Sequence, residues 1–317
     1  MNRWLLAMAG ALTLVAVAGI LPRAAVAADT GAGATTLTRG PVDGARWVPT
    51  AARLDARTEH VYVAEGDGGG GGGGDLAKQL QNPVADLISV PIQANLDQGY
   101  GPEDHAYQWT INVQPVIPIK LNRRWNVISR TILPVVVQEG RLPGQDDAVG
   151  LGDTVQSLFF SPRDAKGLIW GVGPVFLLPT ATEDRLGAKK WGVGPTAVVL
   201  KQQGPWTIGF LGNHIWSFAD AGGASDAQKA MDVNSTFLQP FLTYTFPSAF
   251  SLGVNTESTY DWENETWNVP INVFATQVTK ICRQPVSLGL GFRYWAETPD
   301  GGPEWGIRLI WTFLFPK

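Results

Sequence analysis

Cysteine and histidine are scarce in this sequence, and their scarcity excludes two common ways of stabilising a fold. The 317 residues include one cysteine, Cys282, so no internal disulfide can form. One cysteine and three histidines are too few for a Cys/His zinc finger. We therefore expect no disulfide scaffold, no metal site and no cofactor.

Charged residues are also few, at 16% against the roughly 25% that is usual for a soluble domain. The net charge of −4 argues against a nucleic-acid-binding protein, which normally carries a basic face. The mean hydropathy is zero, which excludes a bundle of long apolar transmembrane helices. What the chain does have is 37 glycines, 22 prolines and 13 tryptophans.

The N-terminal region divides into two segments that precede the main domain. Residues 1–27 are typical of a signal peptide, with Arg3 before an apolar run and Ala25-Val26-Ala27 as the cleavage pattern. A membrane anchor is the alternative reading of this run. Residues 28–75 are predicted to be a disordered linker that ends in the seven glycines 68–74. These glycines are not a phosphate-binding loop, because no Gly-Lys-Ser/Thr follows them.

Residues 76–317 are predicted to form one all-β domain after a short helical turn at 76–81, which Pro83 ends. From Ile88 onward, apolar and polar residues alternate strictly, so each strand has one face in apolar and one in polar surroundings. The pattern predicts about twelve strands: 87–97, 106–120, 125–138, 149–161, 168–180, 191–202, 206–218, 233–246, 250–262, 266–280, 284–296 and 304–315.

The connections between these strands alternate between short turns and longer polar loops, which is typical of transmembrane antiparallel β-barrels of the outer membrane. Tryptophans near most strand ends favour the same architecture, since tryptophan prefers the headgroup level of a bilayer. The alternative is a soluble β-sandwich. The tryptophans in question are Trp109, Trp125, Trp170, Trp191, Trp206, Trp216, Trp262, Trp267, Trp295 and Trp305.

Prolines inside the predicted strands are unexpected, because a closed barrel has no edge at which proline is tolerated easily. We expect a bulge or bend at each of them. They are Pro115, Pro118, Pro134, Pro174, Pro195, Pro240 and Pro270. Two lie in repeated Trp-Gly-Val-Gly-Pro motifs at 170–174 and 191–195, whose glycines would either leave space in the lumen or relieve crowding between strands.

Several short motifs follow one another in a fixed order along the chain. They are 81–91 (QNPVADLISVP), 150–153 (GLGD), 170–174 (WGVGP), 179–182 (PTAT), 191–196 (WGVGPT), 213–217 (NHIWS), Gln239-Pro240 and Tyr244. On these motifs, the chain resembles, over about 76–317, a bacterial envelope family named for the MetA-pathway of phenol degradation, also labelled "transporter" or "neuromedin U". The resemblance implies an outer-membrane barrel that passes small hydrophobic or aromatic molecules.

The polar side of the alternation predicts the residues that line the lumen. An arginine facing lipid at mid-depth would cost about 2–4 kcal/mol, so the mid-strand arginines are expected to face inward. This polar lining is either a charge-paired filling or a selectivity filter, and both roles are compatible. The candidates are Gln93, Asn95, Gln108, Thr110, Asn112, Gln114, Arg130, Asp153, Asn255, Glu257, Asn272, Arg293 and Arg308, with Asp97 and Asp261 on the same parity as their neighbours.

The leading hypothesis is a channel in the outer membrane of a Gram-negative bacterium, for passive uptake of small hydrophobic or aromatic molecules. Its expected partners are outer-membrane lipids, lipopolysaccharide and the barrel-assembly machinery, with no nucleic acid. No catalytic residue is assigned, although a hydrolase of lipid or lipopolysaccharide using His214 or His105 is one alternative. A soluble periplasmic binding protein is another.

Overall fold

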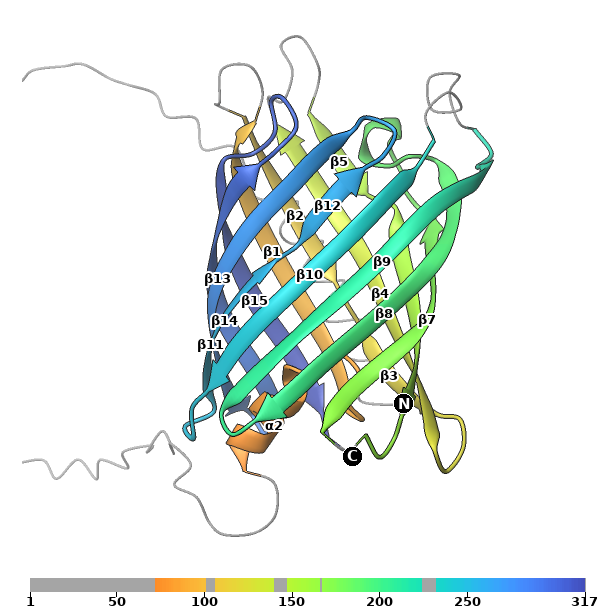
Figure 1. Ribbon diagram of the computed structural model, residues 1–317. Coiled ribbons are helices and arrows are strands. Elements are labelled where there is room, and N and C mark those ends of the chain that lie inside the picture. The colour runs from red at the N-terminus through yellow and green to blue at the C-terminus, as the bar shows by residue number, and fades with distance from the viewer. Residues whose placement is uncertain (1–71, 101–105, 140–146, 166, 224–231, 317) are drawn as a thin grey trace, which may run out of the picture.

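The computed structural model describes residues 72–100, 106–139, 147–165, 167–223 and 232–316, which form a closed antiparallel β-barrel (Figure 1). The predicted signal peptide and all but the last residues of the predicted linker lie outside these ranges. The elements are α2 (Gly73–Leu80), β1 (Ile88–Tyr100), β2 (Ala106–Val113), β3 (Val116–Lys120), β4 (Trp125–Glu139), β5 (Ala148–Leu151), β6 (Thr154–Pro162), β7 (Leu168–Leu178), η1 (Asp184–Leu186), β8 (Lys190–Gln203), β9 (Trp206–Asp220), β10 (Asn234–Thr245), β11 (Phe250–Thr256), β12 (Ser258–Asp261), β13 (Thr266–Ile281), β14 (Gln284–Glu297) and β15 (Trp305–Phe315).

The fifteen segments make twelve barrel strands, as the alternation predicts. The pairs β2–β3, β5–β6 and β11–β12 are each one strand broken in the middle, and every strand pairs with its sequence neighbours. The barrel closes where β1 pairs with β15, from Ile88 opposite Phe315 to Gln98 opposite Trp305. Within the described ranges, every helix is too short or too polar to cross a bilayer.

Most of the strand prolines interrupt hydrogen bonding between strands, as expected. Pro115 separates β2 from β3, and the break between β5 and β6 faces Pro134. The β11–β12 break lies beside Pro240, and the register shifts at Pro270. Pro118 is the exception, because it sits in an uninterrupted ladder with β4. The prolines therefore divide long strands without opening the barrel.

The two Trp-Gly-Val-Gly-Pro motifs lie side by side, with Pro174 directly opposite Pro195. A Cβ atom on Gly173 would overlap the carbonyl oxygen of Leu158, and one on Gly194 would overlap that of His214. The glycines therefore permit a close backbone approach where proline cannot donate to the ladder. This supports the second of the two readings, in which glycine relieves crowding.

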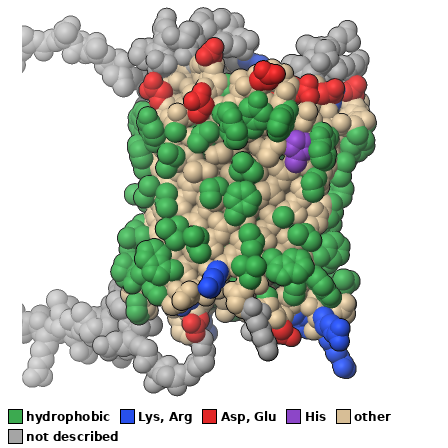
Figure 2. All heavy atoms as spheres, in the orientation of Figure 1, with side chains coloured by type: hydrophobic (Ala, Val, Ile, Leu, Met, Phe, Trp, Pro, Cys, Tyr) green, Lys and Arg blue, Asp and Glu red, His purple; other side chains and the backbone are tan. Residues whose placement is uncertain are grey.

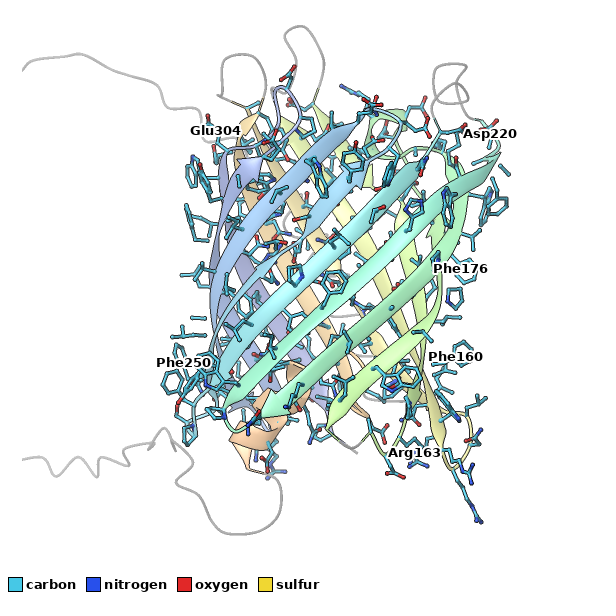
Figure 3. The ribbon with its side chains drawn as sticks, viewed as in Figure 1. Phe160, Arg163, Phe176, Asp220, Phe250 and Glu304 are labelled. Atoms are coloured by element: carbon cyan, nitrogen blue, oxygen red, sulfur yellow. The ribbon has the colours of Figure 1, made fainter. Side chains whose placement is uncertain are left out.

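The outer face of the barrel is apolar. Large hydrophobic side chains such as Leu290, Phe292, Leu309 and Ile307 stay exposed along the strands, while their sequence neighbours point inward and are buried. Figure 2 shows hydrophobic side chains over the visible wall, with acidic side chains gathered at the rim of the long loops. Asp220 and Glu304 mark that rim in Figure 3.

Tryptophans lie towards both ends of the strands, as predicted, and most face outward. Trp206 packs edge-on against Tyr244 near the short turns, while Trp216, Trp262 and Trp267 lie near the long loops. Trp295 differs from the others, because it is 7% exposed and faces the lumen beside Arg293.

Candidate functional site: a charged layer above a closed mouth

A salt bridge inside the lumen joins Arg308 on β15 to Glu257 at the β11–β12 break, with β13 and β14 between them in the wall. Arg308 donates from Nη1 and Nη2 to the two oxygens of Glu257, at 2.8 and 2.7 Å, and from Nε to Oδ1 of Asn95 at 2.6 Å. The arginine side chain is 4% exposed. Bidentate pairs of this kind hold both charged groups in one orientation.

A second bidentate pair lies beside the first. Arg293 on β14 donates to both oxygens of Asp97 on β1, at 2.6 and 2.8 Å, and its guanidinium lies 4.6 Å from the ring of Trp295. Its Nε also donates to Asn272, which donates in turn to Asn255. The two pairs and their amides form one layer, the charged layer, which links the neighbouring strands β11, β13, β14, β15 and β1 on the inner face of the wall.

Arg130 on β4 also faces the lumen but has a neutral partner. Its Nη2 donates to Oε1 of Gln114 at 3.0 Å, and Gln114 donates to Gln93 at 2.9 Å. Among the described residues, no carboxylate lies within ion-pairing distance of Arg130. Arg130, Arg293 and Arg308 thus all point into the barrel, and among the described residues two of them meet a carboxylate.

Other predicted lining residues form an amide and hydroxyl ladder on β1, β2 and β4. Gln138 donates to Gln108, Gln108 donates to Thr110, and Asn112 stands opposite Gln93 in the register. Asp153 and Asp261 lie outside this lining. Asp153 accepts the backbone N–H groups of Ala181 and Ala188, and Asp261 accepts those of residues 263 and 264. Both aspartates therefore hold loops.

One mouth of the barrel is closed by the chain itself, at the end with the short turns. We call residues 76–87, which run from α2 to the start of β1, the floor segment. Ala77 and Leu87 pack in a buried cluster with Ala249, Val278 and Leu314.

Val84, further along the floor segment, reaches a second cluster that includes Ile128, Phe159, Leu200 and Leu211. Lumen-facing residues from β4, β6, β8 and β9 thus meet a segment whose helix packs on β10, β11 and β13. The predicted helical turn exists and begins earlier, at Gly73, but its position across the mouth could not be read from the sequence.

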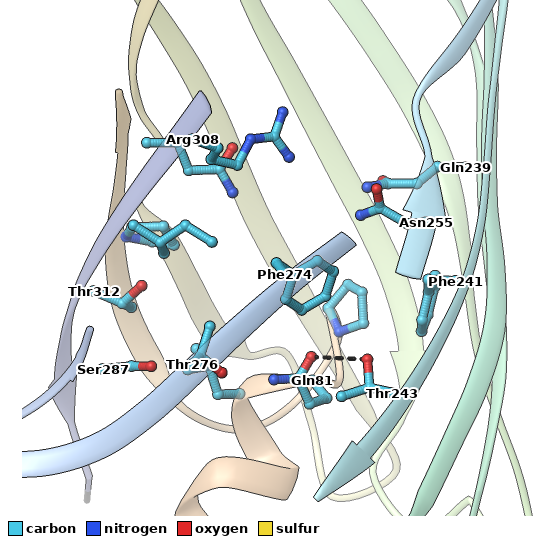
Figure 4. Close-up of a pocket in the computed structure, with 15 residues that line it drawn as sticks. Gln81, Gln239, Phe241, Thr243, Asn255, Phe274, Thr276, Ser287, Arg308 and Thr312 are labelled. Carbon is cyan, nitrogen blue, oxygen red and sulfur yellow. Dashed lines mark hydrogen bonds between the residues drawn. The ribbon is translucent and has the colours of Figure 1, made fainter. Parts of the chain in front are cut away.

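Between the floor segment and the charged layer lies a cavity of about 180 Å³ (Figure 4). Gln81 from the floor segment faces Thr243, whose hydroxyl donates to it at 3.4 Å. Phe241 and Phe274 line one side, and Arg308 lies at the top. A second cavity of about 160 Å³ adjoins it and is lined by Arg130, Gln114 and Leu211, among others.

The lining phenylalanines were not among the predicted residues, although the alternation contains them. Phe241 shares the parity of Gln239 and Thr243 on β10, so its ring lies on the inner face beside polar side chains. Amides and charges on an inner face stand out in a strand sequence, whereas apolar residues do not. The apolar members of the same face were the missed signal.

His214 lies on the outer face, away from the lumen, since it shares its strand parity with the exposed Trp216. Its Nδ1 is 2.7 Å from the hydroxyl of Thr236, and its ring lies 4.1 Å from that of Trp216. Ser217 instead hydrogen-bonds to Asp232, and His105 lies outside the described residues. Among the described residues, no group of three or more His, Cys, Asp or Glu side chains is placed to hold a metal ion.

Comparisons with known proteins bear on the fold. No family model and no curated protein matches the sequence. Among solved structures, an outer membrane channel from Pseudomonas putida F1 is similar over 73% of this chain and 96% of its own, with 17% identity and a TM-score of 0.56. A protein from a study of in-meso crystallization of membrane proteins (6% identity, 72% and 83% coverage) and a bacterial polysaccharide outer membrane secretin (10%, 73% and 99%) give TM-scores of 0.39 and 0.33. At these identities the first comparison supports the fold, and the other two carry no weight.

Proposed function

We propose that this protein is an outer-membrane channel that gives small hydrophobic or aromatic molecules a passive route into a Gram-negative cell. The observation that carries the proposal is the distribution of side chains: large apolar side chains cover the outside of the barrel, while arginines, carboxylates and amides lie inside it beside cavities. Such a surface is stable in lipid and would aggregate in water. The fold shared with an outer membrane channel supports the same conclusion.

The proposed orientation of the barrel in the outer membrane follows from the residues at its two rims. Trp206 at one rim and Trp216, Trp262 and Trp267 at the other suit the two headgroup levels of a bilayer. We place the short turns in the periplasm and the acidic long-loop rim among lipopolysaccharide, by analogy with outer-membrane barrels. Insertion by the barrel-assembly machinery and membership of the MetA-pathway family are part of this proposal.

The size of the two lumen cavities favours small solutes. A cavity of about 150 Å³ lined by apolar side chains is enough to hold benzene, and the larger cavity here measures about 180 Å³. Phe241 and Phe274 offer ring faces and edges, while Gln81 and Thr243 offer hydrogen bonds. A single ring with one polar group is therefore the best match.

The floor segment has to shift before a solute can leave through the short-turn mouth. It is held by apolar packing and by a few hydrogen bonds, such as that from Gln202 Nε2 to the carbonyl oxygen of Lys78 at 2.9 Å. We propose that the segment is a displaceable closure of a passive route.

The test is uptake of phenol and benzyl alcohol into liposomes that contain the protein, with Val84→Asp as the opened variant. A carboxylate buried among Ile128, Phe159 and Leu200 should expel the floor segment. We expect uptake above that of empty liposomes and a further rise for the variant. Leu121→Asp, at an exposed turn, is the control. A heat-modifiable gel shift verifies that each variant is folded. If neither the wild-type protein nor Val84→Asp takes up the solutes, the proposal is refuted.

A further inference from the structure

We propose that the lumen contains a binding site for small aromatic carboxylates, with Arg130 as the residue that holds the carboxylate. This inference rests on the proposed function and narrows the class of solute. It begins from the charges of the lumen. Among the described residues, three guanidinium groups face the lumen and two carboxylates each pair with one of them, so one guanidinium has no carboxylate within ion-pairing distance.

The unpaired charge can be assigned to one residue. Arg308 and Arg293 each direct two N–H groups at a carboxylate, whereas Arg130 donates to the neutral amide of Gln114 at 3.0 Å. An amide orients a guanidinium but does not neutralise it. Arg130 is half-buried in the lumen, where a guanidinium is stabilised by an accompanying anion, which points to an anion supplied from solution.

The position of Arg130 leaves it open to a ligand. It lines the cavity of about 160 Å³ together with Gln93, Gln114 and Gln239. The hydrogen bonds from Arg130 to Gln114 and from Gln114 to Gln93 fix the guanidinium from one side. Its remaining N–H groups can therefore meet an acceptor in the cavity, and a carboxylate matches the planar fork of donors.

The rest of the lining sets the shape of the ligand. The Arg130 cavity shares Leu80, Pro83, Pro91, Gln93 and Gln239 with the larger cavity that contains Phe241 and Phe274. A ligand with its anionic group at Arg130 therefore has apolar and aromatic side chains within the same space. An inorganic anion would contact only the guanidinium of Arg130, whereas an aromatic acid would contact both the guanidinium and the apolar side chains of the adjoining cavity.

Binding is measured by fluorine NMR on the detergent-solubilised full chain. The probes are 4-fluorobenzoate and 4-fluorobenzyl alcohol, which carry the same ring but differ in charge. We expect the benzoate to bind about tenfold more tightly, as a charge-assisted hydrogen bond implies. Arg130→Gln should abolish this preference and Arg130→Lys should retain part of it. Arg163→Gln, at an exposed turn, is the matched control and should change nothing.

Equal binding of the two probes by the wild-type protein, or an unchanged preference in Arg130→Gln, would overturn the inference. If Arg130→Gln does not fold, unlabelled benzoate and benzyl alcohol are compared as competitors of 4-fluorobenzoate on the wild-type protein. Stronger competition by benzoate supports the carboxylate site, and equal competition overturns it. Liposome uptake separates the two proposals. Binding preference without uptake supports the site and refutes the channel, and uptake of both solutes without preference refutes the site alone.

Discussion

Removing the carboxylate of Glu257 tests whether the charged layer holds the barrel together. Glu257→Gln keeps the shape of the side chain but leaves Arg308 without its counter-ion. Two charge-assisted hydrogen bonds of 2.8 and 2.7 Å are weakened, each worth about 1.5–3 kcal/mol. Breaking a buried ion pair from one side costs about 3–5 kcal/mol. Because the Glu257 side chain is 21% exposed, we expect the lower end of that range, about 3 kcal/mol.

The assay is equilibrium urea unfolding in phospholipid vesicles, with Glu257→Gln, Arg308→Gln and the double variant. The double variant should lose less than the sum of the single variants, since it leaves no unpaired charge. Glu263→Gln, on an exposed loop, is the control and should stay within about 0.5 kcal/mol of wild type. A loss below about 1 kcal/mol, or strict additivity, would refute the idea that this pair stabilises the barrel.

Three further substitutions test the wall and its turns by the same unfolding measurement. Leu309→Arg places a charge on the outer face at mid-strand and should cost about 2–4 kcal/mol, whereas a soluble protein with this exposed leucine would lose almost nothing. Gly194→Ala should cost about 1–3 kcal/mol, because the new methyl group overlaps the carbonyl oxygen of His214; no loss would contradict the close approach. Arg283→Gly should stabilise by about 1 kcal/mol, since Arg283 has φ of 72°; a loss of stability would show that its side chain matters more than its backbone.

The ends of the strands could be predicted accurately because each residue of the barrel wall faces either apolar surroundings outside or the lumen inside. Each position faces either lipid or lumen, so the alternation of 284–296 or 125–138 marks a strand within one residue of its ends. The same parity places Arg130, Arg293 and Arg308 inside. It also places Trp295 inside, beside Arg293, although its position near a strand end favoured the outer rim.

The partners within the lumen could not be predicted, because they depend on how a curved sheet brings distant strands together. Glu257 meets Arg308 across two intervening strands, and no local pattern selects that pair over Glu257 with Arg293. The floor segment is a similar case. Its helix is encoded locally, but its place in the mouth depends on contacts such as that with Gln202, more than a hundred residues away.

The position of the floor segment constrains the order in which the chain can assemble. The segment directly precedes β1, and β1 forms the closing seam with β15, the last strand of the chain. Until β15 is made, the seam has no second edge and the cylinder stays open along one side. Residues 76–87 can settle against the inner wall from that open side, and pairing of Ile88 with Phe315 then encloses them. Pairing of β1 with β15, the last ladder to form, therefore closes the barrel and fixes the floor segment inside it in a single step.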